Sequence, residues 1–137
     1  TLGIRMEKHE KNATAIVELL SKHPKIDKIY YPGLTSHPSH TIAKKQQSGF
    51  GGMLSFEISG DLARVKSFIE GMKILPLAGS LGGFESLVSH PYTMTHGNLT
   101  PNQKKEVGIS EGLIRISAGL ENTKDLLEAV NLGLEKI

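Results

Sequence analysis

Arg115 is the residue whose type and surroundings point most directly to chemistry. It lies in the middle of an apolar, β-branched run, residues 113–118, that is typical of a strand. Successive side chains of a strand point to opposite faces, so Arg115 shares a face with Leu113 and Ser117 and opposes Ile114. A buried guanidinium is costly without a partner, whereas its planar fork can hold a carboxylate through two parallel hydrogen bonds. The pattern predicts a carboxylate-binding arginine or, more simply, an arginine that lies on a solvated face or pairs with an acid of its own chain.

Ser80 begins a turn of small residues that includes Gly82 and Gly83. Glycines let a ligand approach the backbone N–H groups closely, and the serine hydroxyl can donate to an anion. The segment lacks the lysine that follows the glycines in a phosphate-binding loop. We therefore expect either a plain turn or a weak contact with an anion.

The histidines and the lack of cysteine give no indication of a metal site. His90 and His96 are six residues apart, a spacing that suits neither one helix face nor a common zinc pattern. His37 and His40 flank a proline in a polar segment, where solvated side chains are expected. With no cysteine in the chain, disulfides, thiolate nucleophiles and cysteine zinc sites are excluded.

Composition is that of an ordinary globular domain. The chain has 137 residues, of which 38% are hydrophobic and 22% charged, with a formal net charge of +2. Its scattered basic residues predict no nucleic-acid or membrane partner. No apolar run approaches the roughly 20 residues that span a bilayer, and no signal peptide is evident, so we expect a cytoplasmic protein. The chain starts with threonine inside a helical pattern, so we expect the natural protein to extend upstream.

Hydrophobic periodicity predicts elements that alternate between helix and strand, with a long irregular segment from residue 78 to 99. Few connections are long enough for repeated parallel crossovers. We therefore expect an α/β small domain, residues 1–137, built on an open, mostly antiparallel sheet of about four strands with helices packed on one side. Predicted helices span about residues 2–21, 41–47 and 62–70 and follow Thr100 and Asn122, and predicted strands span 26–31, 53–58, 74–77 and 113–118.

Ordered motifs along nearly the whole chain resemble one enzyme family. They occupy residues 31–34, 36–38, 40, 49–57, 80–87, 90–91, 94–96, 108–117 and 119–121. Together they are similar to the C-terminal domain of the γ-subfamily of Cys/Met-metabolism enzymes, which depend on pyridoxal phosphate (PLP). Cystathionine γ-synthase, cystathionine γ-lyase, methionine γ-lyase and the O-acylhomoserine sulfhydrylases are members.

The resemblance implies a fold-type-I enzyme whose large domain holds the PLP cofactor through a Schiff-base lysine. No Ser-x-Thr-Lys motif occurs here, so no catalytic residue is expected in this chain, and which residues contact the cofactor stays open. By resemblance, Arg115 and Ser80 hold the α-carboxylate of a small amino-acid substrate. Thr95 matches a threonine near the cofactor lysine and the substrate.

Gly79 departs from the family pattern. Many cystathionine-processing members carry glutamate there and methionine-lyase types an apolar residue, so glycine removes a clue to specificity. Other segments look more like the cystathionine enzymes, which predicts γ-elimination or γ-replacement. The alternatives are a methionine γ-lyase or O-acylhomoserine sulfhydrylase domain, or an isolated non-catalytic folding or interaction module. The resemblance also implies a homotetramer and a partner large domain, without which the chain is expected to be inactive.

Overall fold

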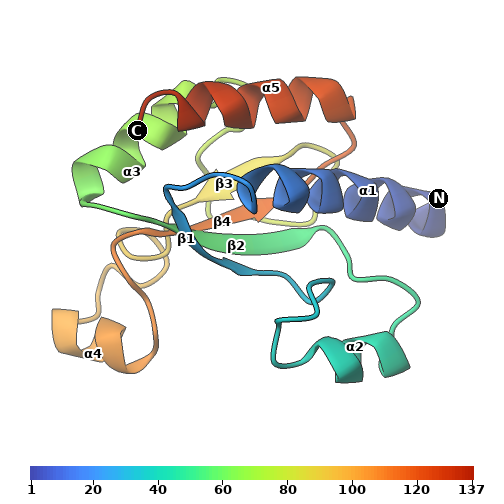
Figure 1. Ribbon diagram of the computed structural model, residues 1–137, viewed down its shortest axis with the longest axis horizontal. Coiled ribbons are helices and arrows are strands. Elements are labelled where there is room, and N and C mark those ends of the chain that lie inside the picture. The colour runs from blue at the N-terminus through green and yellow to red at the C-terminus, as the bar shows by residue number, and fades with distance from the viewer.

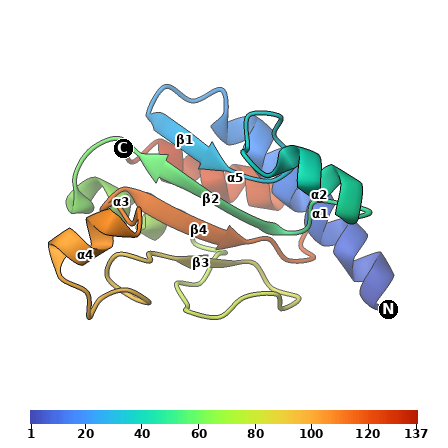
Figure 2. The same ribbon diagram turned by 90° about the horizontal axis from the view of Figure 1, so that it is seen from below.

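The computed structural model describes residues 1–137 and has one open sheet. Its strands are β1 (Ile26–Tyr30), β2 (Met53–Ile58), β3 (Leu87–Ser89) and β4 (Leu113–Ser117). They lie in the order β1-β2-β4-β3, and every neighbouring pair is antiparallel (Figure 2). The expectation of an open antiparallel sheet of four strands is confirmed.

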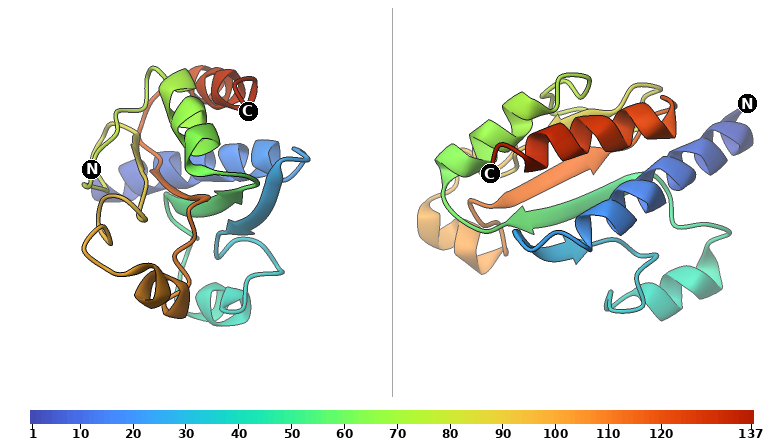
Figure 3. Two further views of the ribbon diagram at one scale, coloured as in Figure 1. Left: turned by 90° about the vertical axis from the view of Figure 1, so that its left-hand side faces the viewer. Right: turned by 45° about the horizontal axis from the view of Figure 1, so that its top comes forward.

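Three helices cover one face of the sheet. These are α1 (Leu2–Leu20), α3 (Leu62–Gly71) and α5 (Thr123–Leu134), which lie above the strands in Figure 1 and over them in the right-hand view of Figure 3. The shorter α2 (His40–Gln46) and α4 (Pro101–Glu106) lie below the sheet in Figure 1, toward its two ends. The middle of the lower face is therefore not covered by a helix. None of the helices combines the length and apolarity that crossing a membrane requires.

The core lies between the sheet and the three covering helices. Alternate residues of β2 are buried, as the period of a strand dictates for a sheet with one packed face. Phe56 of β2 meets Phe68 of α3 edge to face, with ring centroids 5.7 Å apart. Ile114 and Ile116 of β4 are fully buried in the same cluster. Because these isoleucines face the helices, Arg115 between them points to the opposite face.

Helix starts follow the signals in the sequence. Thr100 and Gln103 form a complete capping box at α4, with Pro101 in the first turn. Asn122 caps α5, and Asp61 caps α3 through a bond from the Arg64 N–H to its side chain, 3.1 Å long. Each cap satisfies a backbone donor that the first helical turn leaves free.

One predicted strand is wrong and one strand was not predicted. Residues 74–77 form no strand, and only Leu77 makes an isolated parallel bridge to Val88. The fourth strand is β3, which lies inside the segment expected to be irregular. Its three residues are too short a run to show alternation, and all three are buried.

Candidate functional site

A row of four polar side chains crosses the uncovered face of the sheet. Antiparallel register places Tyr30 opposite Ser55, Ser55 opposite Arg115, and Arg115 opposite Ser89. Directly opposed residues have Cβ atoms about 4.5–5.5 Å apart and share a face. The row therefore brings one residue from each strand to the same line across the sheet.

Arg115 is half-buried and is held by backbone carbonyls rather than by an acid. Its Nη2 donates to the Ser80 carbonyl oxygen at 3.1 Å and to that of Gly79 at 3.4 Å. The only ion pair in the chain joins Lys66 and Glu70 on α3. The alternative of an arginine paired with an acid of its own chain is therefore wrong. Arg115 does lie on the face that no helix covers, and its hydrogen bonds are exposed. The guanidinium is oriented and still carries an unpaired charge.

Glu57 is the acid on the same face of the neighbouring strand, and hydroxyl groups already occupy both of its oxygens. Tyr30 donates to Oε1, and Ser110 donates to Oε2 at 2.8 Å. Burial, and then the hydrogen bond and the negative charge of Glu57, raise the pKa of Tyr30 to about 12. Glu57 is thus engaged by two hydroxyl donors, and no ion pair joins it to Arg115.

Backbone and side-chain bonds fix the loop that carries Ser80. The N–H of Gly82 donates to Ser117 Oγ at 2.8 Å, which ties the loop to the face of β4 that also carries Arg115. Further along, Leu120 N–H donates to the Phe84 carbonyl at 2.7 Å. A Cβ on Gly119 would lie 2.5 Å from that same carbonyl oxygen, so this approach requires glycine.

A partly buried carboxylate contact fixes the far end of the loop. Glu121 accepts the Ser86 hydroxyl at 2.7 Å as well as its backbone N–H, and Ser86 Oγ in turn accepts the Gly119 N–H at 2.7 Å. Hydrogen bonds to charged groups are among the stronger ones in proteins. The loop from residue 79 to 86 is thus fixed beside Arg115 at both ends.

The residues singled out in the sequence do not all meet. The backbone carbonyls of Gly79 and Ser80 contact Arg115, and Ser80 is exposed. Thr95 is also exposed, but its hydroxyl is hydrogen-bonded to its neighbour His96 at 2.8 Å and not to Arg115 or Ser80. Next to Gly79, an added Cβ would find no atom within 4 Å, so the space there is open.

The histidines have local structural contacts. His90 is buried, with Nε2 bonded to the Glu111 carbonyl and Nδ1 to Thr93 Oγ1, both at 2.8 Å. His40 Nδ1 is bonded to the Pro32 carbonyl at 2.8 Å. No group of three metal-binding side chains is present in the structure.

Sequence reasoning did not identify the row neighbours Tyr30, Ser55 and Ser89. Alternation along residues 113–118 gave the face of Arg115, but strand order and register decide which residues lie beside it. The sequence pattern could not mark Ser89 as a strand residue, because β3 is only three residues long.

Fold and site together define an open-sheet α/β domain with an oriented, unpaired arginine on its uncovered face. The family model for Cys/Met metabolism PLP-dependent enzymes matches residues 1–135. The L-methionine γ-lyase of Fusobacterium nucleatum subsp. polymorphum is 50% identical over 137 residues, which are 100% of this chain and 35% of that protein. The cystathionine γ-lyase of Dictyostelium discoideum is 47% identical over 99% of this chain and 35% of its own length.

Solved structures agree with the sequence relatives. The cystathionine γ-synthase of Xanthomonas oryzae pv. oryzae, in complex with cystathionine, superimposes with a TM-score of 0.94 at 46% identity. The match covers 99% of this chain and 35% of that one. The chain therefore belongs to the Cys/Met metabolism PLP-dependent enzymes, whose cofactor is PLP, and spans about a third of the length of these relatives.

The residues at Arg115 fit an acid group and do not by themselves fit PLP. A PLP site needs a lysine amine, a partner for the pyridine nitrogen and donors for the phosphate. Arg115 and the Ser80 hydroxyl supply only anion contacts, and no lysine hydrogen-bonds to either residue. The buried Lys104 is engaged elsewhere, 3.9 Å from the ring centroid of Tyr92. We assign no cofactor contact to this chain.

Proposed function

We propose that this chain is the part of a PLP-dependent transsulfuration enzyme that binds the α-carboxylate of the amino-acid substrate. The observation that carries the proposal is the unpaired guanidinium of Arg115, oriented beside Ser80 on the uncovered face of the sheet. A planar fork on a rigid strand suits a carboxylate, which it can bind through two hydrogen bonds. The Ser80 hydroxyl supplies a further donor, and Thr95 lies closer to the reacting end of the substrate.

Holding the carboxylate orients the substrate for the reaction. PLP in the whole enzyme supplies an electron sink, and the protein decides which bond of the substrate is aligned with it. A two-point contact at the acid end restricts rotation of the bound amino acid, which lowers the entropic cost of reaching the transition state. In this role Arg115 contributes mainly to substrate binding.

The substrate we propose is a sulfur amino acid of the cystathionine type, used in γ-elimination or γ-replacement. Relatives named for cystathionine and for methionine are similarly close, at 47% and 50% identity, so identity does not separate the two substrates. A methionine γ-lyase is the second candidate. Gly79 beside Arg115 leaves open space where a larger side chain would meet the substrate, and we propose it as a specificity position.

A PLP-bearing large domain is the partner that we propose for the uncovered face, within a cytoplasmic homotetramer. Leu77, Leu81 and Phe84 support this, because they are exposed around the loop that holds Ser80. Phe84 is 70% exposed, and apolar patches of this kind are typical of contact surfaces.

Replacement of Arg115 in the full-length enzyme tests the proposal. Arg115→Ala should cost about 2 kcal/mol or more of substrate binding, a rise in KM of roughly 30-fold or more, with a smaller loss in kcat. Arg115→Lys should recover only part of this, because an ammonium keeps the charge and loses the fork.

Arg64→Ala is the matched control. Arg64 is exposed at the start of α3 and donates to the Ser59 carbonyl at 2.9 Å, so its loss should leave KM unchanged. Steady-state kinetics with L-cystathionine and L-methionine provide the measurement. An Arg115→Ala enzyme with the KM of the parent for both substrates would remove the carboxylate assignment.

A further inference from the structure

Two buried polar atoms in the row across the sheet have no hydrogen-bond partner. They are Nε of Arg115 and Oγ of Ser89, and Ser89 is only 1% exposed. Buried polar atoms in folded proteins are almost always paired, so two neighbouring exceptions need an explanation. The remaining unpartnered atom of this kind is Nε of Arg5, on α1.

Strand register puts these two residues side by side. Ser89 of β3 is directly opposite Arg115 of β4, so both side chains project from the same face. The chemistry is complementary, because Nε–H is a donor and a serine hydroxyl can accept. Both atoms are closed to solvent, so neither water nor a substrate can reach them in this arrangement.

The same burial determines which edge of the guanidinium a ligand can approach. Nε is enclosed, whereas the hydrogen bonds from Nη2 to the Gly79 and Ser80 carbonyls are exposed. A carboxylate arriving from outside therefore meets the terminal nitrogens. The guanidinium is planar, so an acceptor for Nε–H fixes the orientation of both terminal nitrogens.

We propose that Ser89 is a positioning residue for the carboxylate site: its hydroxyl accepts the Nε–H of Arg115 when a ligand carboxylate binds the terminal nitrogens. This inference rests on the proposed function of Arg115. In the structure, Nη2 donates to the loop carbonyls, and Nε–H of Arg115 has no acceptor. The proposed contact requires a rotation of Ser89 between staggered rotamers and a shift of the guanidinium.

Removal of the Ser89 hydroxyl should have opposite effects on the stability of the fold and on the binding of a carboxylate. A buried hydroxyl without a partner destabilises the folded state, so its removal should leave the melting temperature unchanged or raise it. The same removal should weaken the binding of a carboxylate, because Arg115 loses the acceptor that orients it. If Ser89 had only a structural role, loss of its hydroxyl would instead lower the melting temperature.

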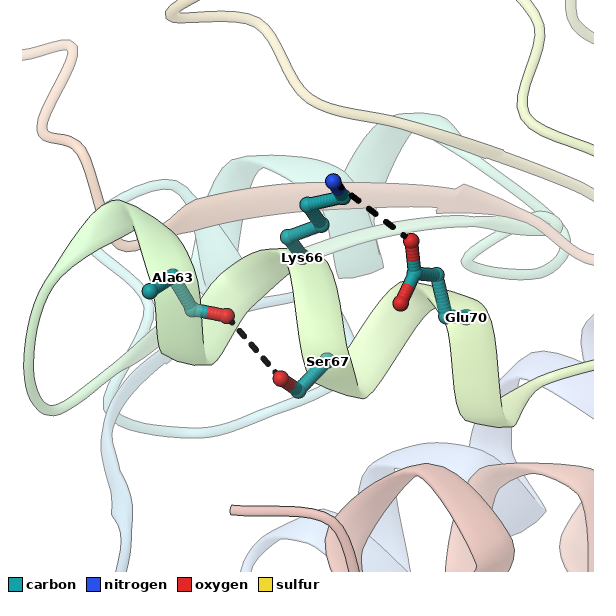
Figure 4. Close-up of polar contacts among 4 residues, drawn as sticks. All are labelled: Ala63, Lys66, Ser67 and Glu70. Carbon is teal, nitrogen blue, oxygen red and sulfur yellow. Dashed lines mark hydrogen bonds and ion pairs between the residues drawn. The ribbon is translucent and has the colours of Figure 1, made fainter.

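Ser89→Ala in the full-length PLP enzyme tests this, with Ser67→Ala as the matched control. Ser67 lies on α3, on the helix-covered side of the sheet, and its hydroxyl donates to the Ala63 carbonyl at 3.1 Å (Figure 4). The probes are L-norleucine and n-pentylamine as competitive inhibitors, since they differ only by the carboxylate. The Arg115→Ala enzyme is measured alongside.

For Ser89→Ala we expect inhibition by L-norleucine to weaken about 10-fold, the loss expected for one hydrogen bond to a charged group. The KM of the substrate should rise similarly, with kcat less affected, n-pentylamine unchanged and the melting temperature not lowered. Ser67→Ala should bind both inhibitors as the parent does.

Three results would overturn the assignment of Ser89. Unchanged L-norleucine inhibition in Ser89→Ala, with weakened inhibition in Arg115→Ala, removes Ser89 and leaves the Arg115 site standing. Equal weakening for both inhibitors together with a lowered melting temperature indicates a structural role. Unchanged inhibition in both variants rejects the carboxylate site itself and the role of Ser89 with it.

Discussion

Tyr30 and Glu57 show how single side chains keep the uncovered face available for a ligand. The Tyr30 hydroxyl and the Ser110 hydroxyl both donate to the carboxylate of Glu57. An acid satisfied in this way has less to gain from turning toward Arg115. Arg115 lies two residues along β4 from Leu113, which is the cross-strand partner of Glu57. These hydroxyl contacts therefore help to maintain an unpaired guanidinium.

The raised pKa of Tyr30 makes the contact measurable. Burial and Glu57 move it from 10.0 to about 12, so the folded protein holds this proton more tightly than the unfolded chain. The resulting stability is fully present below pH 10 and is lost as pH rises from 10 toward 12. We expect Tyr30→Phe to flatten the decline in unfolding free energy over this range, as measured by denaturant unfolding at a series of pH values.

Tyrosinate absorbance provides the check on that assignment. Burial also raises the pKa of Tyr31, so both tyrosines contribute to the absorbance change at high pH. Subtracting the Tyr30→Phe titration from that of the parent isolates the phenol of Tyr30. A difference spectrum that titrates at the ordinary value near 10.0 would contradict the Glu57 contact.

Packing between elements depends on two glycines where α3 meets α5. A Cβ on Gly71 would lie 2.7 Å from the Cα of Gly133, and a Cβ on Gly133 would lie 2.8 Å from the Phe68 carbonyl oxygen. Backbone atoms at these distances cannot move aside as a flexible side chain can. The close approach places α5 against α3 and over the strand that carries Arg115.

Gly133→Ala should therefore destabilise the protein although alanine is the better helix former. We expect a net loss of about 1–3 kcal/mol from overpacking, measured as a change in unfolding free energy. Gly3→Ala is the matched control, because Gly3 is also helical and an added Cβ meets nothing within 4 Å. That change should be neutral or slightly stabilising, and equal effects of the two substitutions would argue against the close contact.

Local signals in the sequence were sufficient for the helices and for β1, β2 and β4. Capping residues such as Thr100 and Asn122 marked helix starts, and alternation marked β2. The short β3 was not predicted, because its pairing with β4 and its burial are properties of the tertiary structure. For the same reason Arg115 could be singled out from one strand alone, whereas Ser89 could be found only after the register was known.

At the scale of the whole molecule, no helix covers the middle of the sheet face that carries Arg115. The strand face with Arg115 has helices only toward its ends (Figures 1 and 2). Leu81 and Phe84 in the loop beside it are exposed. Relatives of this chain are about three times its length, and the family depends on PLP. An anion contact without a lysine at the same place is what one would expect of the smaller contributor to a shared active site.

The isolated 137 residues should therefore neither bind PLP stably nor turn over L-cystathionine. In the proposed function Arg115 and Ser80 hold one acid group, and a single charge-assisted pair that is partly open to water is too weak to retain a cofactor. Titration with PLP, followed by absorbance, should show no Schiff-base band at the concentrations at which the full-length enzyme is saturated. A stable band from the isolated chain, or release of product from L-cystathionine, would mean that one of its own lysines forms the cofactor site, and the division of labour proposed for Arg115 would have to be abandoned.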